Sequence, residues 1–317
     1  MNEKNKESID SYLNTYYDIK KQIQIPLSNE LIKIIALLYN ISNKPFQVEL
    51  FEEIGERINK KIGYSSNAGE MPYVMGTILN IKYEYPFTEI NRLLHIIKII
   101  EQYELYKDYS LFIACILLDE DNIKDRLEKS RNTFYNMQDR HSFITGEDDF
   151  TFSILLSELS KDTNALMDDV EYYYRALAKD CFKRGNSLQL LSHVVTLMEN
   201  DNKDKAIENC IYIYKVMKQH RMKIKDIIYA LIGVMSTVME EQQELIIVEI
   251  KEVMEYLNNT KLFKKSKEFN CIMGIFTVIK LQEYDSKGLY HIGNTSKKTI
   301  SYSLLIAILS NLLPINH

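Results

Sequence analysis

The sequence has no tryptophan and only ten glycines and five prolines among its 317 residues. Soluble proteins use roughly 7% glycine and 5% proline on average, so this chain has few of the residues that tight turns and strand ends need. These shortages favour helices over strands. Hydrophobic residues make up 46% of the chain, which is enough to fill a proper core. We therefore predict an all-α protein.

The sequence also lacks the motifs that mark familiar chemistry. Its four cysteines form no CxxC pair and have none of the spacing of a structural zinc site; they are Cys115, Cys181, Cys210 and Cys271. There is no P-loop, GxGxxG, HExxH, EF-hand or GxSxG pattern. Standard nucleotide or protease chemistry is therefore disfavoured. We expect no cofactor, assign no catalytic residue, and favour a non-catalytic role over an enzyme.

A strong excess of one charge is absent as well. The net charge is −5 and both signs are interspersed, so we expect no nucleic-acid partner. The charged stretch Met1–Glu7 leads into no apolar segment of the kind that a secretory signal contains. No apolar run reaches the roughly twenty residues of a transmembrane helix. With cysteines that resemble small core residues of a reducing compartment, these features predict a cytoplasmic protein.

The chain does contain a recurring pattern of helices. Past residue 86, aromatic residues that we expect to be buried recur at intervals near forty residues, each followed seven or eight residues later by a large apolar residue. The aromatic residues are Tyr135, Tyr174, Tyr214 and Tyr256, and the apolar ones are Phe143, Phe182, Met222 and Phe263. This period predicts stacked helical hairpins, each burying its apolar face against its neighbours, either as a compact array or as an α-α superhelix.

We accordingly predict one all-helical domain over residues 1–317. It comprises N-terminal helices in 1–85, helical-hairpin repeats in 86–285, and a polar loop followed by a C-terminal helix in 286–317. The last helix is too short and too often interrupted by serine to span a bilayer. We expect it to cap the final repeat, and the alternative is that it docks on a membrane surface or a partner.

The first of two polar loops runs from Arg140 to Asp149. It places His141 near Glu147, Asp148 and Asp149, and carboxylates beside an imidazole can bind a divalent metal. A structural interpretation is favoured, because Thr145-Gly146-Glu147-Asp148 has the spacing of a capping box and Gly146 fits the residue that ends the preceding helix. A metal or ligand site is the alternative.

The second loop, Cys181–Gln189, matches the first in that a Phe precedes a Gly by three residues. Gly185-Asn186-Ser187 is predicted to end one helix and cap the next, on which Gln189 and His193 share a face. If neighbouring hairpins stack in register, His193 approaches Asp148 or Asp149; a hydrogen-bonded structural histidine is the alternative. The candidate ligand-binding residues are Arg140, His141, Thr145, Asp148, Asp149, Asn186, Gln189 and His193.

The two loops together resemble an uncharacterised family of low-GC Gram-positive bacteria, domain-of-unknown-function family 4003. The residues that carry the resemblance are Arg140-His141-Ser142-Phe143-Ile144-Thr145 with Asp148-Asp149, and Gly185-Asn186-Ser187-Leu188-Gln189-Leu190-Leu191-Ser192-His193. The similar length implies that the resemblance covers nearly the whole chain. It implies no known activity and supplies no catalytic residues.

Two functions remain open at this point. The first is a non-catalytic scaffold whose stacked helices bind a protein or peptide partner, with outward-facing tyrosines as contacts. The second is a metal-binding or small-molecule-binding protein, possibly hydrolytic, with a site built from His141, Asp148, Asp149 and His193.

Overall fold

The computed structural model describes residues 1–62, 70–103, 109–198, 202–238, 240–285 and 297–312, and it leaves the side chains of residues 280–302 out of the description. Across these residues the chain forms fifteen α-helices and short 3-10 turns, with no β-strand. The predicted all-α class is therefore confirmed. None of the described helices is long and apolar enough to cross a membrane.

The chain divides into two compact units, which we describe separately. The N-terminal unit comprises residues 3–123 with 315–317, and the C-terminal unit comprises residues 1–2 with 124–314. The single domain and its predicted internal boundaries stay a prediction.

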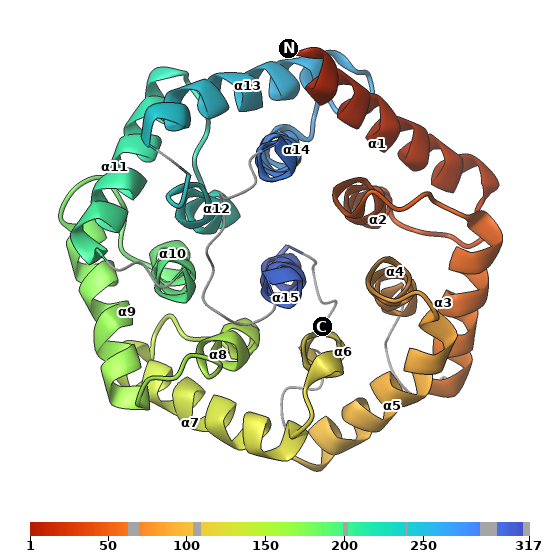
Figure 1. The fold of residues 1–317 in the computed structure, drawn as a ribbon, viewed down its shortest axis with the longest axis horizontal. Helices are drawn as coiled ribbons and strands as arrows, with labels where there is room; N and C mark the ends of the chain where they lie inside the picture. The colour runs from red at the N-terminus through yellow and green to blue at the C-terminus, as the bar shows by residue number, and fades with distance from the viewer. Residues whose placement is uncertain (63–69, 104–108, 199–201, 239, 286–296, 313–317) are drawn as a thin grey trace. The chain divides into compact units, whose positions relative to one another are not determined.

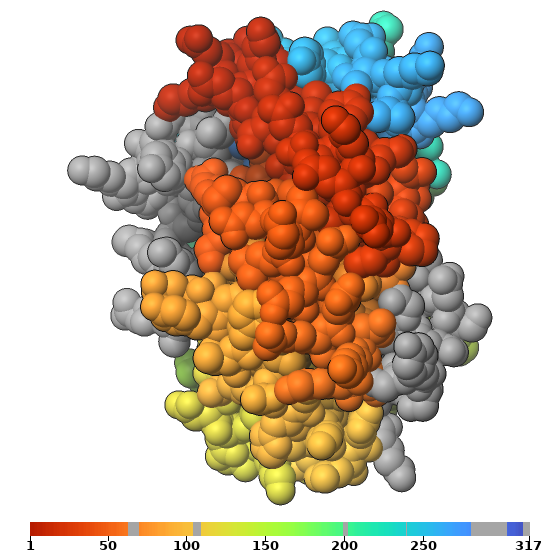
Figure 2. Space-filling model, turned by 90° about the vertical axis from the view of Figure 1, so that its right-hand side faces the viewer, coloured from red at the N-terminus to blue at the C-terminus, as the bar shows by residue number. Residues whose placement is uncertain are grey.

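The N-terminal unit is built from three helix pairs. They are α1 (Glu3–Gln22) with α2 (Asn29–Ser42), α3 (Val48–Ile62) with α4 (Met71–Lys82), and α5 (Pro86–Gln102) with α6 (Ser110–Ile116), which the 3-10 turn Leu117–Asp119 extends. The first helix of each pair is amphipathic, whereas the second is buried along nearly its whole length. Figure 2 shows one face of this unit, across which the chain runs in order from α1 in red to α5 in yellow-orange.

Local sequence signals set several helix ends in this unit. Ser28 caps α2, because its hydroxyl oxygen accepts a hydrogen bond from the backbone N–H of Leu31. Asn43 ends the helix in the left-handed conformation, which asparagine tolerates better than most residues. Both ends of α2 are thus set by residues next to the helix in the sequence.

In the C-terminal unit, long helices alternate with helices that run in a different direction (Figure 1), and all of the latter except the 19-residue α14 are short. The long ones are α7 (Ile123–His141), α9 (Thr163–Ala178), α11 (Lys203–Gln219) and α13 (Glu240–Asn259). The helices between them are α8 (Phe150–Leu156), α10 (Asn186–Leu197), α12 (Ile227–Met235) and α14 (Lys267–Asp285). Helices α7, α9 and α11 begin 40 residues apart, at residues 123, 163 and 203. That the pairs are copies of one repeat unit stays a prediction.

Burial and charge place the two kinds of helix in two layers. Each long helix buries one stripe, such as Met167, Val170 and Tyr174 of α9, and exposes its other face to solvent. Neighbouring long helices are joined by ion pairs at their polar edges, including Lys205 with Glu240 at 2.5 Å. By contrast, α10 is buried at every residue from Leu188 to Leu197, so it forms part of the unit's core.

Two of the aromatic landmarks do not occupy the positions that the predicted period gives them. Tyr135 is 53% exposed, because the preceding residue Phe134 faces inward and packs against Phe150 with ring centroids 5.4 Å apart. Phe143 is fully exposed on the loop after α7, whereas Phe182 is buried against Tyr214 at 4.8 Å. The expectation of a buried aromatic at Tyr135 was therefore wrong.

The last helix, α15 (Lys297–Ser310), lies beside α8. Residues 304–309 are buried, and the hydroxyls of Ser310 and Thr151 are 3.2 Å apart. Most of the predicted polar loop, 286–296, lies outside the described residues. The role of α15 as a cap stays a prediction.

Candidate functional site

The first loop forms a compact turn between α7 and α8. The backbone N–H groups of Ile144 and Thr145 both donate to the carbonyl oxygen of His141, each at 3.0 Å. After the turn, the backbone N–H of Gly146 donates to the carboxylate of Asp149 at 3.0 Å. These hydrogen bonds fix the path of the loop into the 3-10 turn Glu147–Asp149 and then into α8.

The predicted cap is displaced by one residue. The residue that caps the 3-10 turn is Gly146, and its backbone N–H donates to the carboxylate of Asp149. The prediction had Thr145 as the cap and Asp148 as its partner. Gly146 also does not end α7 in a left-handed conformation, because its φ is −108° and α7 stops at His141. The displacement has a physical cause: the hydroxyl of Thr145 makes other hydrogen bonds.

Thr145 joins the two loops. Its hydroxyl donates to the carbonyl oxygen of Met137 at 3.3 Å, and it accepts a hydrogen bond from the side-chain amide of Gln189 at 2.8 Å. Both side chains are buried. A buried hydrogen bond between residues 44 positions apart therefore connects the loop after α7 to the first turns of α10.

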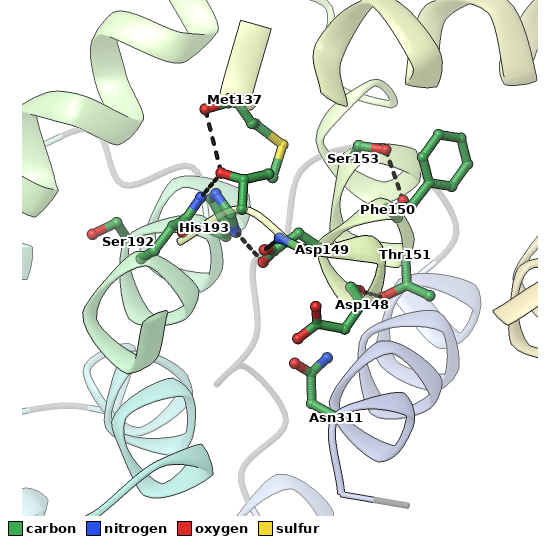
Figure 3. A network of polar contacts seen from close by, with 12 residues as sticks. Met137, Asp148, Asp149, Phe150, Thr151, Ser153, Ser192, His193 and Asn311 are labelled. Carbon is green, nitrogen blue, oxygen red and sulfur yellow. Dashed lines mark hydrogen bonds and ion pairs between the residues drawn. The ribbon is translucent and has the colours of Figure 1, made fainter. Parts of the chain in front are cut away.

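Asp149 and His193 make a second connection between the loops. The Nδ1 atom of His193 lies 3.9 Å from a carboxylate oxygen of Asp149 (Figure 3), and the two residues are 0% and 2% exposed respectively. This separation is too long for a hydrogen bond. The prediction that His193 approaches Asp148 or Asp149 agrees with this geometry.

Burial keeps this pair uncharged. It raises the pKa of Asp149 to about 8, with a further contribution from the negative charge of Asp148 and an opposing one from the Gly146 N–H. Burial also lowers the pKa of His193 to about 3, with a smaller contribution from His141. Although the pair is close enough to be an ion pair, the desolvation of both groups outweighs their attraction, and both are neutral between about pH 3 and pH 8.

Arg140 and His141 contact α9 and do not join the Asp149 pair. The guanidinium of Arg140 lies 2.7 Å from the carboxylate of Asp168, and the Nε2 of His141 lies 2.7 Å from a carboxylate oxygen of Glu171. Sequence reasoning missed these two acidic partners. Their spacing of three residues on one face of α9 is the signal that could have identified them.

Asp148 and Asn186 lie at the margin of the predicted site. In Figure 3 Asp148 lies on the opposite side of Asp149 from His193, and its backbone carbonyl accepts a hydrogen bond from Thr151 at 2.9 Å. Asn186 is the exposed first residue of α10, directly after Gly185. Gly185 has a φ of 138°, a conformation that only glycine adopts readily. The structure thus pairs Thr145 with Gln189 and Asp149 with His193; that the predicted set binds a ligand stays a prediction.

A small cavity of about 10 Å³ lies between α7, α9 and α10. It is lined by Met137, Arg140, His141, Met167, Val170, Glu171, Gln189 and His193. A cavity of this volume has room for about one water molecule. Among the residues that the structure describes, no three His, Cys, Asp or Glu side chains gather closely enough to hold a metal ion.

Comparison with known families agrees with the resemblance carried by the two loops. The model of the family described as "Protein of unknown function (DUF4003)" matches residues 15–308. The chain belongs to this family. The DUF4003 match includes both loops and nearly all of the described helices.

One relative comes from Bacillus subtilis (strain 168) and carries the name "Uncharacterized protein YeaA". It is 22% identical over 294 residues, which cover 89% of this chain and 86% of the relative. No solved structure matches the chain. The DUF4003 assignment therefore brings no activity, and any function must be argued from the residues themselves.

Proposed function

We propose that this DUF4003 chain is a non-catalytic binding protein that holds a protein or peptide partner through Phe143. The observation that carries the proposal is the complete exposure of this aromatic side chain, on a loop whose residues otherwise form internal hydrogen bonds. Aromatic residues, phenylalanine among them, are enriched at protein interfaces relative to the rest of the surface.

The loop around Phe143 is suited to this role because it is held on both sides. The turn is closed onto His141 by the backbone N–H groups of Ile144 and Thr145, and Thr145 is tied to Gln189 of α10. A loop ordered before binding loses little conformational entropy when a partner engages it. Hydrogen bonds inside the protein thus support the presentation of one apolar side chain to solvent.

The buried positions of the candidate residues favour binding over catalysis. His193 and Asp149 are buried away from solvent, and the cavity beside His193 has room for about one water molecule. A substrate of several atoms therefore has no room there. The alternative function as a metal-binding protein would need three or more grouped His, Cys, Asp or Glu side chains, and the described residues contain no such group.

Exposed tyrosines extend the proposed surface along the long helices. Tyr172 of α9 and Tyr212 of α11 are both exposed, and their helices contact one another. The hydroxyl of Tyr172 already donates a hydrogen bond to the carboxylate of Asp204 at 2.5 Å, so it is not free to bind a partner. We therefore assign the main anchor to Phe143 and a supporting role to Tyr212.

The test is a photo-crosslinking amino acid placed at position 143 in host cells, with the same group at the buried position 182 as the matched control. We expect one crosslinked partner from position 143 and none from position 182. With the partner purified, Phe143→Ala is expected to weaken binding by at least about thirtyfold, as loss of a hot-spot residue does. Tyr85→Ala, which removes an exposed tyrosine of the N-terminal unit, should leave affinity unchanged.

Either of two results would contradict the proposal. One is the absence of a discrete crosslink at position 143 in protein that gives a normal helical circular dichroism spectrum. The other is a partner that binds Phe143→Ala and the unaltered protein equally well.

A further inference from the structure

The most unusual polar atoms in the C-terminal unit belong to Gln189 and His193. Both side chains are at least 99% buried and both line the cavity between α7, α9 and α10. The Oε1 atom of Gln189 and both ring nitrogens of His193 have no hydrogen-bond partner within the described protein. Buried polar atoms rarely remain unpaired, since each lost hydrogen bond destabilises the folded state.

The orientation of the Gln189 amide is fixed by its neighbours. Thr145 donates its single hydroxyl hydrogen to the carbonyl of Met137, so it can only accept from Gln189. The Nε2 of Gln189 must therefore face Thr145, as the 2.8 Å hydrogen bond shows. This orientation leaves the Oε1 of Gln189 as an acceptor on a residue that lines the cavity.

The orientation of His193 follows from Asp149. The 3.9 Å between Nδ1 and the carboxylate is too long for a direct hydrogen bond. It is also too short for an intervening water, because two hydrogen bonds of about 2.8 Å through a tetrahedral water span roughly 4.6 Å. No water can therefore bridge Nδ1 to Asp149, and we take Nε2 as the nitrogen that finds its partner in the cavity.

We infer that the cavity beside His193 is a binding site for one structural water molecule, which bridges the Nε2–H of His193 to the Oε1 of Gln189. The cavity volume of about 10 Å³ is close to the smallest that holds a water, and a buried water needs about two to four polar partners. The water completes a directed chain of hydrogen bonds from His193 through the water to Gln189, from Gln189 to Thr145, and from Thr145 to Met137.

This water site explains why glutamine stands at position 189 and histidine at position 193, where packing alone would allow apolar residues. Gln189 supplies a donor for Thr145 and an acceptor for the water, which an apolar side chain of the same size cannot do. His193 is held in the tautomer that carries its hydrogen on Nε2. Arg140 and His141, which also line the cavity, have partners in Asp168 and Glu171.

The inference is tested by a crystal structure of the full chain at about 1.5 Å and by nitrogen NMR shifts of the His193 ring. We expect a buried water within about 3 Å of both His193 Nε2 and Gln189 Oε1, and the shifts of an Nε2–H tautomer. In Gln189→Met the water peak should disappear and Tm should fall by about 4 °C. Gln219→Met, at the exposed end of α11, should change neither quantity.

Three results would overturn the inference. The first is an empty cavity at that resolution, and the second is a direct hydrogen bond between His193 Nδ1 and Asp149. The third is a ring protonated on Nδ1, which NMR reports even if Gln189→Met does not fold.

Discussion

Replacing Asp149 with asparagine is expected to remove a loss of stability that the unaltered protein suffers as pH rises. The pKa of Asp149 is about 8 in the folded protein and about 3.9 in an unfolded chain. The folded state therefore holds a proton that the unfolded state releases between these values. The stabilising contribution of Asp149 is complete below about pH 4. It is lost as pH rises to about 8, and the free energy of unfolding falls by roughly 1.4 kcal/mol per pH unit.

His193 changes the shape of this profile. Its pKa is about 3 in the folded protein and about 6.5 in an unfolded chain, so its contribution is complete above about pH 6.5 and falls toward pH 3. The two slopes oppose each other between about pH 4 and pH 6.5. Between about pH 6.5 and pH 8 only Asp149 differs in protonation between the two states. Its effect lowers the free energy of unfolding by about 2 kcal/mol across this range.

Urea unfolding between pH 5 and pH 9 measures this effect directly. The difference in unfolding free energy between the unaltered protein and Asp149→Asn should shift in favour of the variant as pH rises to about 8 and level off above it, because asparagine does not ionise. Asp139→Asn, at an exposed position on α7, serves as the matched control and should give a profile parallel to the unaltered protein. Parallel profiles for Asp149→Asn would show that this carboxyl is ionised in the folded state.

Replacing Thr145 with valine is expected to destabilise the protein although the two side chains have nearly the same shape. Valine cannot accept the hydrogen bond from Gln189, so a buried amide is left without its partner. Such a loss costs about 1–3 kcal/mol. Thermal unfolding of Thr145→Val should show this loss, whereas Thr145→Ser keeps the hydroxyl and should retain most of the stability. Equal stability of the valine and serine variants would contradict the proposed contact.

The sequence was sufficient to predict the helices because their signals are local. The scarcity of glycine and proline and the 46% of hydrophobic residues indicated an all-α protein, and the described residues form fifteen α-helices. The period of about forty residues was less informative about burial, because a shift of one residue exchanges the inward Phe134 for the outward Tyr135. Such a shift depends on packing between helices, which no local pattern specifies.

The candidate site was predictable only in part for a similar reason. The four-residue spacing of Gln189 and His193 places them on one helical face, and the alignment of neighbouring hairpins brings His193 to Asp149. The partners of Arg140 and His141 were missed, because the spacing of Asp168 and Glu171 marks a shared face of α9 but does not say which residues that face meets. The exposure of Phe143 was also unforeseen, since a phenylalanine in a recurring pattern is usually part of the core.

The loops at residues 140–149 and 185–193 form an internal junction through Thr145 and Gln189. A double-mutant cycle with Thr145→Val and Gln189→Met measures that junction most directly. We predict that the double variant loses at least about 1 kcal/mol less stability than the sum of the single variants, because removing both partners leaves neither unsatisfied. Losses that add within about 0.3 kcal/mol would show that the two residues do not interact.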